Sequence, residues 1–253
     1  MDHMTRRWFA PVAAIAVLPI VIGCSSNSSS GPSLEGSWHG FVAMHDEFGV
    51  PLTSDSGVIV TISNNGHAGP STVSSADGGF TLADLHTGTY TLTYTGDGIG
   101  PFLRPEIAFV GGGTQFLGTQ NLSTVSAGTV SALTAQPSAT GDTLEITGAI
   151  AAPPTGLSRF VRLFFGGATS VSAAPTNYSV STSFKVTKGV LDLSVTDTAL
   201  ASIRAAFGSG NPAYVVGYGD SFFTDSYVDT ATGNTVYPNV STTPSNVVAF
   251  IVP

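Results

Sequence analysis

The chain has 253 residues, which is enough for one or two domains with a buried core. Only 9% of its residues are charged, and the net charge is −8. The eight Lys and Arg residues lack the clustering that a phosphate backbone requires, which excludes nucleic-acid binding. An anionic membrane surface would repel this chain, so any membrane attachment must be hydrophobic. Abundant Gly, Ser, Thr and Val instead favour a β-rich exported protein.

Residues 1–23 are predicted to be a targeting segment. Arg6 and Arg7 precede an apolar run from Trp8 to Gly23 that contains two prolines. The run is shorter than the about 20 apolar residues that a transmembrane helix needs. We therefore expect it to address the protein to the envelope and to take no part in the fold.

The apolar run ends in Val21-Ile22-Gly23-Cys24, which includes the only cysteine of the chain. This order resembles the lipobox of bacterial lipoproteins. The resemblance implies that Cys24 becomes the first mature residue and carries palmitate-type acyl chains. The thiol is the nucleophile for that modification, and two or three chains make a stable anchor. The alternatives are an ordinary signal peptide with a chance cysteine and an uncleaved apolar helix.

Residues 24–33 form a Ser-rich stretch that we interpret as a flexible tether. It would hold the folded part away from a bilayer to which Cys24 is attached. In the lipoprotein family, a serine after the cysteine favours export to the outer membrane of a diderm bacterium, and Ser25 occupies that position. The expected location is the cell envelope, with the outer membrane favoured.

Residues 34–125 show the pattern of a first β domain. In Thr89–Thr95, Tyr90, Leu92 and Tyr94 alternate with threonines, which is typical of a half-buried strand. Val58–Ile62 is a second strand candidate. Asp77-Gly78-Gly79 predicts a tight turn into a strand that starts at Phe80.

The stretch 40–98 resembles the carboxypeptidase regulatory-like domain, a small sandwich of the transthyretin (prealbumin) type. The matching positions are Gly40, Val42, Asp46, Gly49, Pro51, Leu52, Val58, Val60, Thr72, Asp77, Gly79, Phe80, Leu82, Leu85, Gly88, Tyr90 and Leu92. The resemblance implies a non-catalytic module, with Phe80, Leu82, Tyr90 and Leu92 in its core. Further strands near 103–110 and 115–123 would complete it.

Residues 126–142 are small and polar, and we interpret them as a linker or edge segment. Residues 143–253 then predict a second sandwich, Ig-like or similar. Its strand candidates are 144–150, 159–165, 178–184, 190–195, 213–218 and 247–252. A short helix is expected near 198–207, capped by Asp197 or Thr198 and ended by Gly208. Residues 227–238 predict a hairpin. The overall class is all-β, with two sandwich domains.

No sequence motif points to catalysis or to a cofactor. The mature part of the chain has four histidines, His39, His45, His67 and His86, but no H-E-x-x-H and no further cysteine. The nucleophile-elbow motif G-x-S-x-G is also missing. We therefore expect a protein that is not an enzyme and that holds no cofactor.

Two weaker candidate sites lie in the C-terminal half. Asp220, Asp225 and Asp229 could offer oxygen ligands to Ca²⁺, although solvated carboxylates at a sheet edge are the simpler interpretation. Four aromatic residues of the same segment could stack on sugars, although core packing is again simpler. They are Tyr214, Tyr218, Phe222 and Tyr227.

The sequence thus favours a lipid-anchored envelope protein whose domains bind, adhere or scaffold through a protein or glycan partner. The alternative is a surface glycan-binding lipoprotein that uses the aromatic residues of 214–237. An enzyme with an unrecognised site is the third and weakest hypothesis. None of the three involves a nucleic acid.

Overall fold

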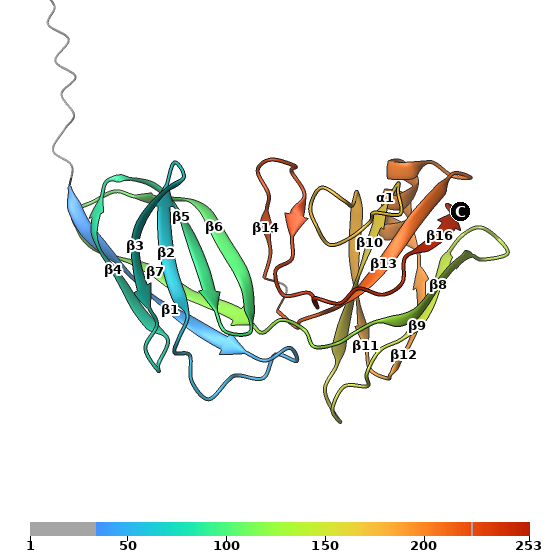
Figure 1. Ribbon diagram of the computed structural model, residues 1–253, viewed down its shortest axis with the longest axis horizontal. Coiled ribbons are helices and arrows are strands. Elements are labelled where there is room, and N and C mark those ends of the chain that lie inside the picture. The colour runs from blue at the N-terminus through green and yellow to red at the C-terminus, as the bar shows by residue number, and fades with distance from the viewer. Residues whose placement is uncertain (1–33, 224) are drawn as a thin grey trace, which may run out of the picture. The chain divides into compact units, whose positions relative to one another are not determined.

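A computed structural model describes residues 34–223 and 225–253 (Figure 1). These residues form two β-sandwiches and one short helix, so the predicted all-β class is confirmed. The predicted signal segment, Cys24 and the whole serine tether lie outside the described residues. Within the described ranges, no helix is both long and apolar enough to cross a membrane.

The first sandwich is built from seven strands in two sheets. The strands are β1 (Glu35–His45), β2 (Ile59–Asn64), β3 (His67–Val73), β4 (Gly79–His86), β5 (Gly88–Gly96), β6 (Ile99–Phe109) and β7 (Gly113–Ser123). One sheet has the order β4-β1-β7 and the other the order β3-β2-β5-β6. β1 and β7 are parallel, and the other pairs of both sheets are antiparallel. The strands predicted near 103–110 and 115–123 are thus present as β6 and β7.

Period-two alternation decides which side chains enter the first core. Along β1, Trp38, Gly40, Val42 and Met44 are buried, while the residues that alternate with them face outward. Trp38 packs edge-on against the rings of Tyr90 and Phe109. The predicted core positions Phe80, Leu82 and Leu92 are buried, and Tyr90 packs half-buried against them. Gly78, at the predicted tight turn, has a φ of 82°.

The second sandwich also has seven strands. They are β8 (Ser131–Pro137), β9 (Leu144–Ala149), β10 (Arg159–Gly166), β11 (Val180–Val186), β12 (Val190–Val195), β13 (Pro212–Asp220) and β16 (Val248–Ile251). One sheet has the order β11-β10-β13-β16 and the other the order β12-β9-β8. A separate hairpin joins β14 (Tyr227–Val228) to β15 (Thr235–Val236), at the position where the sequence predicts it.

β10 is buried on both faces, which explains why its sequence is apolar without alternation. Val161, Leu163 and Phe165 enter the core between the two sheets. Phe164, on the opposite face, packs into a smaller aromatic cluster with Tyr178. Residues 126–142, interpreted above as a linker or edge segment, contain β8, which is an edge strand.

The helix α1 (Asp197–Phe207) matches the prediction except at its first turn. Thr196 occupies the N-cap position and makes no capping hydrogen bond with its side chain, so the predicted cap at Asp197 or Thr198 is corrected. Gly208, with a φ of 78°, ends the helix as predicted. The apolar face of the helix buries Leu200 and Ile203 in the second core.

Candidate functional site

The loop after β1 joins the two sandwiches through a buried ion pair. One carboxylate oxygen of Glu47, Oε2, accepts from Arg159 Nη1 at 2.7 Å and from the Ser126 hydroxyl at 2.8 Å. It also accepts from the backbone N–H of Ala127 at 3.0 Å. The guanidinium of Arg159 in addition lies 4.9 Å from the ring centroid of Phe48. The Arg159 side chain is buried and that of Glu47 is only 13% exposed, so their hydrogen bonds must offset a large loss of hydration.

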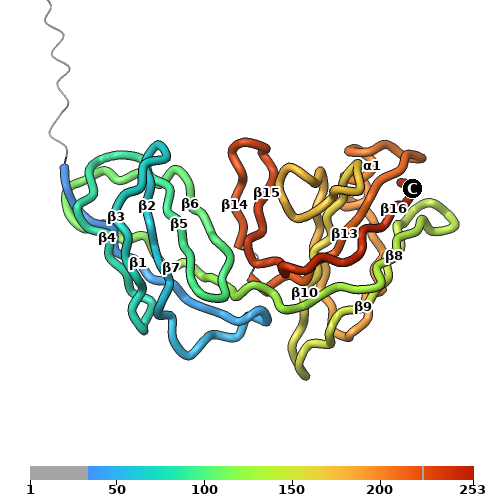
Figure 2. The backbone as a smooth tube through the Cα atoms, viewed as in Figure 1, coloured from blue at the N-terminus to red at the C-terminus, as the bar shows by residue number. Residues whose placement is uncertain are grey.

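A second polar contact joins the sandwiches at Asp225. Its Oδ2 accepts from the backbone N–H of Ser123 at 2.9 Å and from Asn239 Nδ2 at 2.8 Å. Asn239 Oδ1 in turn accepts from the N–H of Gly100 in β6. Burial raises the pKa of Asp225 to about 6, and these hydrogen bonds offset part of that rise. Nearby, β14 lies beside β6 (Figure 2).

The other two aspartates proposed as calcium ligands serve separate structural roles. Asp220 accepts from Arg162 Nε at 2.8 Å inside the second sandwich, and burial raises the pKa of Asp220. Asp229 closes the β14–β15 hairpin through the hydroxyl and N–H of Thr232, and these bonds lower its pKa. In the part of the chain that the structure describes, no three metal-ligating side chains come together, and this holds for His39, His45, His67 and His86 as well.

The four aromatic residues proposed for sugar stacking do not form one surface. Tyr218 is 7% exposed, and Tyr214 packs half-buried against the same cluster. Tyr227 packs half-buried on the first core, with its ring edge-on to Phe102. Phe222 alone of the four is exposed, at 48%. Core packing thus accounts for three of these side chains.

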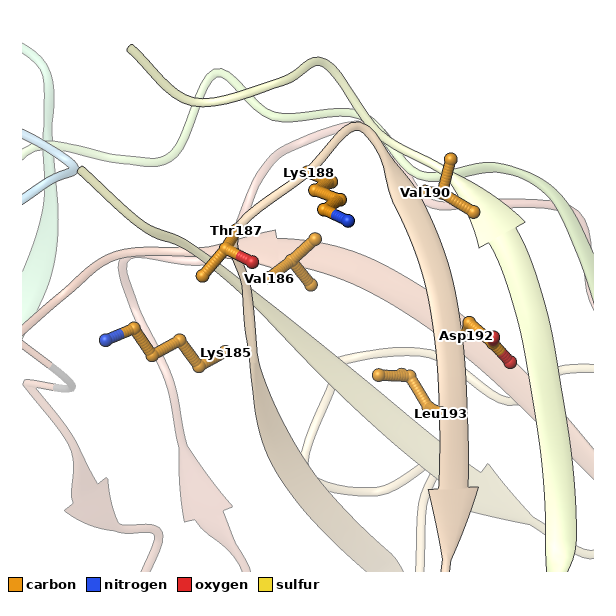
Figure 3. A pocket seen from close by; sticks show the side chains of 7 residues that line it. All are labelled: Lys185, Val186, Thr187, Lys188, Val190, Asp192 and Leu193. Atoms are coloured by element: carbon orange, nitrogen blue, oxygen red, sulfur yellow. The ribbon is translucent and has the colours of Figure 1, made fainter. Parts of the chain in front are cut away.

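A shallow groove of about 400 Å³ lies at the open edge of the second sandwich, where β11 leads into β12. Its lining residues are Lys185, Val186, Thr187, Lys188, Val190, Asp192 and Leu193 (Figure 3). The two lysines are exposed, and lysine on an edge strand protects a sheet from pairing with another chain. Protection of the sheet edge thus accounts for the lysines of this groove, and no ligand is needed to explain them.

An exposed aromatic patch lies on the outer face of the β4-β1-β7 sheet. We define it as His39, Phe41 and Phe116. His39 pairs in register with Phe116 of the parallel strand β7. The imidazole and the Phe116 ring are tilted by 32° with centroids 6.0 Å apart, and Phe41 packs edge-on against both. Phe116 is 66% exposed, and its contacts with His39 and Phe41 make it part of a contiguous aromatic patch rather than a singly exposed side chain.

The positions around this patch carry hydroxyl and amide groups. On β7, Thr114, Thr119 and Asn121 are exposed and lie opposite Ser37, Phe41 and Ala43 of β1. On β4, the exposed Thr81 lies opposite His39. No Asp, Glu, Lys or Arg occupies these paired positions. The face is therefore aromatic at its centre and hydroxylated around it. The exposed carboxylate of Glu35 lies on the same side of β1, and that of Asp77 lies close to His39.

More aromatic side chains follow at the other end of β1. His45 lies on the same outer face as His39 and Phe41, because alternate residues of a strand share a face. The His45 ring lies 4.4 Å from that of Phe223, centroid to centroid, and Phe223 packs edge-on against Phe222. Phe222 then packs edge-on against the ring of Phe160 on β10.

The complete aromatic patch could not be predicted from the sequence, for a structural reason. Alternation within residues 39–45 already places His39, Phe41 and His45 on one side of a strand. Phe116 joins them only because β7 pairs in parallel with β1, and a parallel partner so distant in the sequence cannot be deduced from alternation. Outward aromatic residues on a single strand therefore indicate two of the three patch residues, His39 and Phe41.

The chain matches no protein-family model and no curated protein. Among solved structures it is similar to a Bacteroides uniformis protein described as a candidate carbohydrate-binding protein, at 14% identity and a TM-score of 0.30. That match covers 86% of this chain and 99% of the other. A DUF3823 family protein of Parabacteroides merdae matches at 18% identity and a TM-score of 0.28. That match covers 83% of this chain and 98% of the other. The major pilin subunit of Bacillus cereus matches at 11% identity and a TM-score of 0.32. That match covers 86% of this chain and 69% of the other.

These scores are too low to place the chain in a family. The all-β assignment rests instead on the chain's own strands and their pairing.

Proposed function

We propose that the chain is a non-catalytic binding and adhesion module of the cell envelope, anchored by acyl chains on Cys24. The observation that carries this proposal is that the buried charged side chains make structural contacts. Glu47, Arg159 and Asp225 hold two sandwiches together, and Arg162 and Asp220 brace a sheet. Charged side chains arranged in this way contribute to a firm support for exposed faces, whereas an active site aims them into a cavity.

The anchor part of the proposal follows from the order of the first 33 residues. An apolar segment, a cysteine and a Ser-rich tether precede β1, so a lipid at Cys24 would hold the first sandwich near the membrane. The division of the chain into a signal segment (1–23), a tether (24–33) and two modules belongs to the same proposal. So does membership of the first module in the carboxypeptidase regulatory-like family.

Acylation is tested on the full chain expressed in a bacterium with lipoprotein-processing enzymes. Growth with an alkyne-tagged palmitate should label the wild-type protein and leave Cys24→Ser unlabelled. Intact-mass measurement of detergent-extracted protein should show Cys24 as the first residue. A free thiol at Cys24 in membrane-extracted protein would contradict the anchor.

The binding role is tested separately with the same full chain. Cells that display the wild-type protein should adhere to isolated envelope polysaccharide or protein more strongly than cells that lack it. A broad hydrolase screen on the purified protein serves as the opposing measurement. Turnover of any substrate, with the activity tracking the purified chain, would contradict a non-catalytic role.

Glycan binding through the aromatic residues of 214–237 finds less support. Tyr218 is buried, and Tyr214 and Tyr227 are half-buried in separate packing contacts, so these rings do not form one surface for a sugar. The exposed aromatic patch on β1 and β7 offers a better surface.

A further inference from the structure

We infer that the outer face of the β4-β1-β7 sheet binds an extended, uncharged oligosaccharide along β1, with His39, Phe41 and Phe116 at its centre. This inference rests on the proposed function, because it names the ligand class for one face of the binding module. It places the ligand on the first sandwich, away from the aromatic residues of 214–237 that the sequence offers as an alternative site.

The aromatic rings supply the stacking surface. The face of an aromatic ring is electron-rich, and the C–H groups of a sugar ring are weakly positive, so the two attract one another. His39 and Phe116 lie tilted by only 32°, side by side on neighbouring strands, and Phe41 supports both rings edge-on. These contacts fix the rings before a ligand arrives, which lowers the entropy lost on binding.

The imidazole of His39 supplies a fixed polar contact. Its Nδ1 lies 3.0 Å from the carbonyl oxygen of Phe80. A carbonyl can only accept, so in the neutral ring Nδ1 donates and Nε2 is left as an acceptor. A sugar hydroxyl can donate to that nitrogen while the sugar ring packs on Phe116. The neighbouring hydroxyls of Thr81 and Thr119 can both donate and accept, as sugar hydroxyls require.

The charges around the aromatic patch disfavour an anionic ligand. No Asp, Glu, Lys or Arg pairs directly with His39, Phe41 or Phe116, the carboxylates of Glu35 and Asp77 lie nearby, and the whole chain carries a net charge of −8. Acidic polysaccharides and a second copy of the chain would both meet long-range repulsion from that net charge. A neutral glycan meets none. Of the occupants that an aromatic sheet face could take, the neutral glycan therefore fits best.

The length of the face favours a chain over a single sugar. His39 and His45 lie on the same side of β1, about 20 Å apart at the usual rise of a strand. His45 then meets Phe223, which packs against the exposed Phe222. A longer oligosaccharide can thus reach a second aromatic contact at Phe222, which a short one cannot.

The test measures binding of the full chain, in detergent, to neutral glucan and xylan oligosaccharides of graded length by isothermal calorimetry. Phe116→Ala should weaken binding of every length by about tenfold or more. Phe222→Ala should weaken binding of the longer oligomers only. Val73→Ala, which trims another exposed apolar side chain of the first sandwich, should bind as the wild type does. Circular dichroism confirms that each variant is folded.

Two results would overturn the inference. One is wild-type protein that binds none of these oligosaccharides, or a Phe116→Ala variant that binds them unchanged. The other is a concentration-dependent dimer that Phe116→Ala abolishes, which would make the face a contact between copies. Neither result bears on acylation of Cys24 or on adhesion to envelope material, so failure here is distinguishable from failure of the proposed function.

Discussion

The environment of each carboxylate decides how much that group contributes to the stability of the folded protein. Glu35 and His86 form an exposed pair at 3.7 Å, and such pairs contribute about 0–1 kcal/mol. Glu47 is buried and is the acceptor for three donors, one of them a buried guanidinium. Removing a buried partner costs far more than the pair itself contributes, because the remaining charge stays dehydrated.

We predict that Glu47→Ala lowers the free energy of unfolding by about 3–5 kcal/mol. The variant leaves the Arg159 guanidinium buried without its counter-charge. Glu35→Ala removes the same chemical group from an exposed pair and should cost less than about 1 kcal/mol. Urea denaturation of the two variants gives the comparison. Equal losses would show that the Glu47–Arg159 contact is not buried in solution.

Asp225 makes stability depend on pH in a defined direction. Its pKa rises from an ordinary 3.8 to about 6 in the folded chain, mainly through burial. The folded state therefore holds the proton more tightly than the unfolded state does. The stabilising contribution is complete below about pH 4 and is lost as pH rises through about 6. Asp220, whose pKa burial also raises, acts with the same sign.

Lowering the pH from 7 to 5 should accordingly raise the melting temperature of the wild type. Asp225→Asn, which keeps the shape of the side chain and cannot titrate, should show a smaller rise. Asp192→Asn removes an exposed carboxylate and controls for the change in net charge. If Asp225→Asn and Asp192→Asn have the same pH profile, the Asp225 carboxyl is solvated.

At the scale of elements, most of the strands and turns could be predicted from alternation and from turn residues. β5 and the hairpin at 227–238 follow from local pattern, because a strand with one buried face alternates and a tight turn needs glycine or asparagine. β8 was harder to predict, since small polar residues in an edge strand resemble those of a linker. β10 appeared as an apolar run, and only tertiary structure shows that both of its faces are covered.

The candidate sites were predicted less well because they depend on pairing across long sequence distances. Asp220, Asp225 and Asp229 are close in sequence, yet each bonds to a different part of the fold. Phe116 reaches His39 only through the parallel β1–β7 pair. Sequence spacing says which residues are neighbours on one strand, whereas a surface is assembled from several strands.

The approach of β6 to the segment after β15 depends on a single glycine. A Cβ atom on Gly100 would lie 1.9 Å from the carbonyl oxygen of Pro238. We predict that Gly100→Ala destabilises the protein by about 1–3 kcal/mol, because the two backbones must move apart. Gly167→Ala adds the same methyl group where nothing lies within 4 Å and should change stability by less than about 0.5 kcal/mol. Guanidinium denaturation of both variants measures the difference.

At the scale of the whole molecule, the described residues form one compact unit although they contain separate hydrophobic cores. Cores that do not merge can unfold independently unless specific contacts join them. Here the joining contacts are mostly polar. Asn239 takes part in several of them, since it bonds to Asp225, to the N–H of Gly100 and, through its own carbonyl, to the N–H of Ser126.

Asn239 should therefore control cooperativity as well as stability. We predict that the wild type unfolds in one calorimetric transition and that Asn239→Ala shows two. The alanine leaves the Gly100 N–H and one side of the Asp225 carboxylate without a partner, at about 1–3 kcal/mol for each buried group. That loss falls on the contacts between the sandwiches and spares both cores, so one sandwich can melt before the other. Asn211→Ala, at an exposed asparagine beside the end of α1, should keep a single transition. Two transitions in the wild type would show that the cores melt independently, and a rigid face extending from β1 to Phe222 would then lose its support.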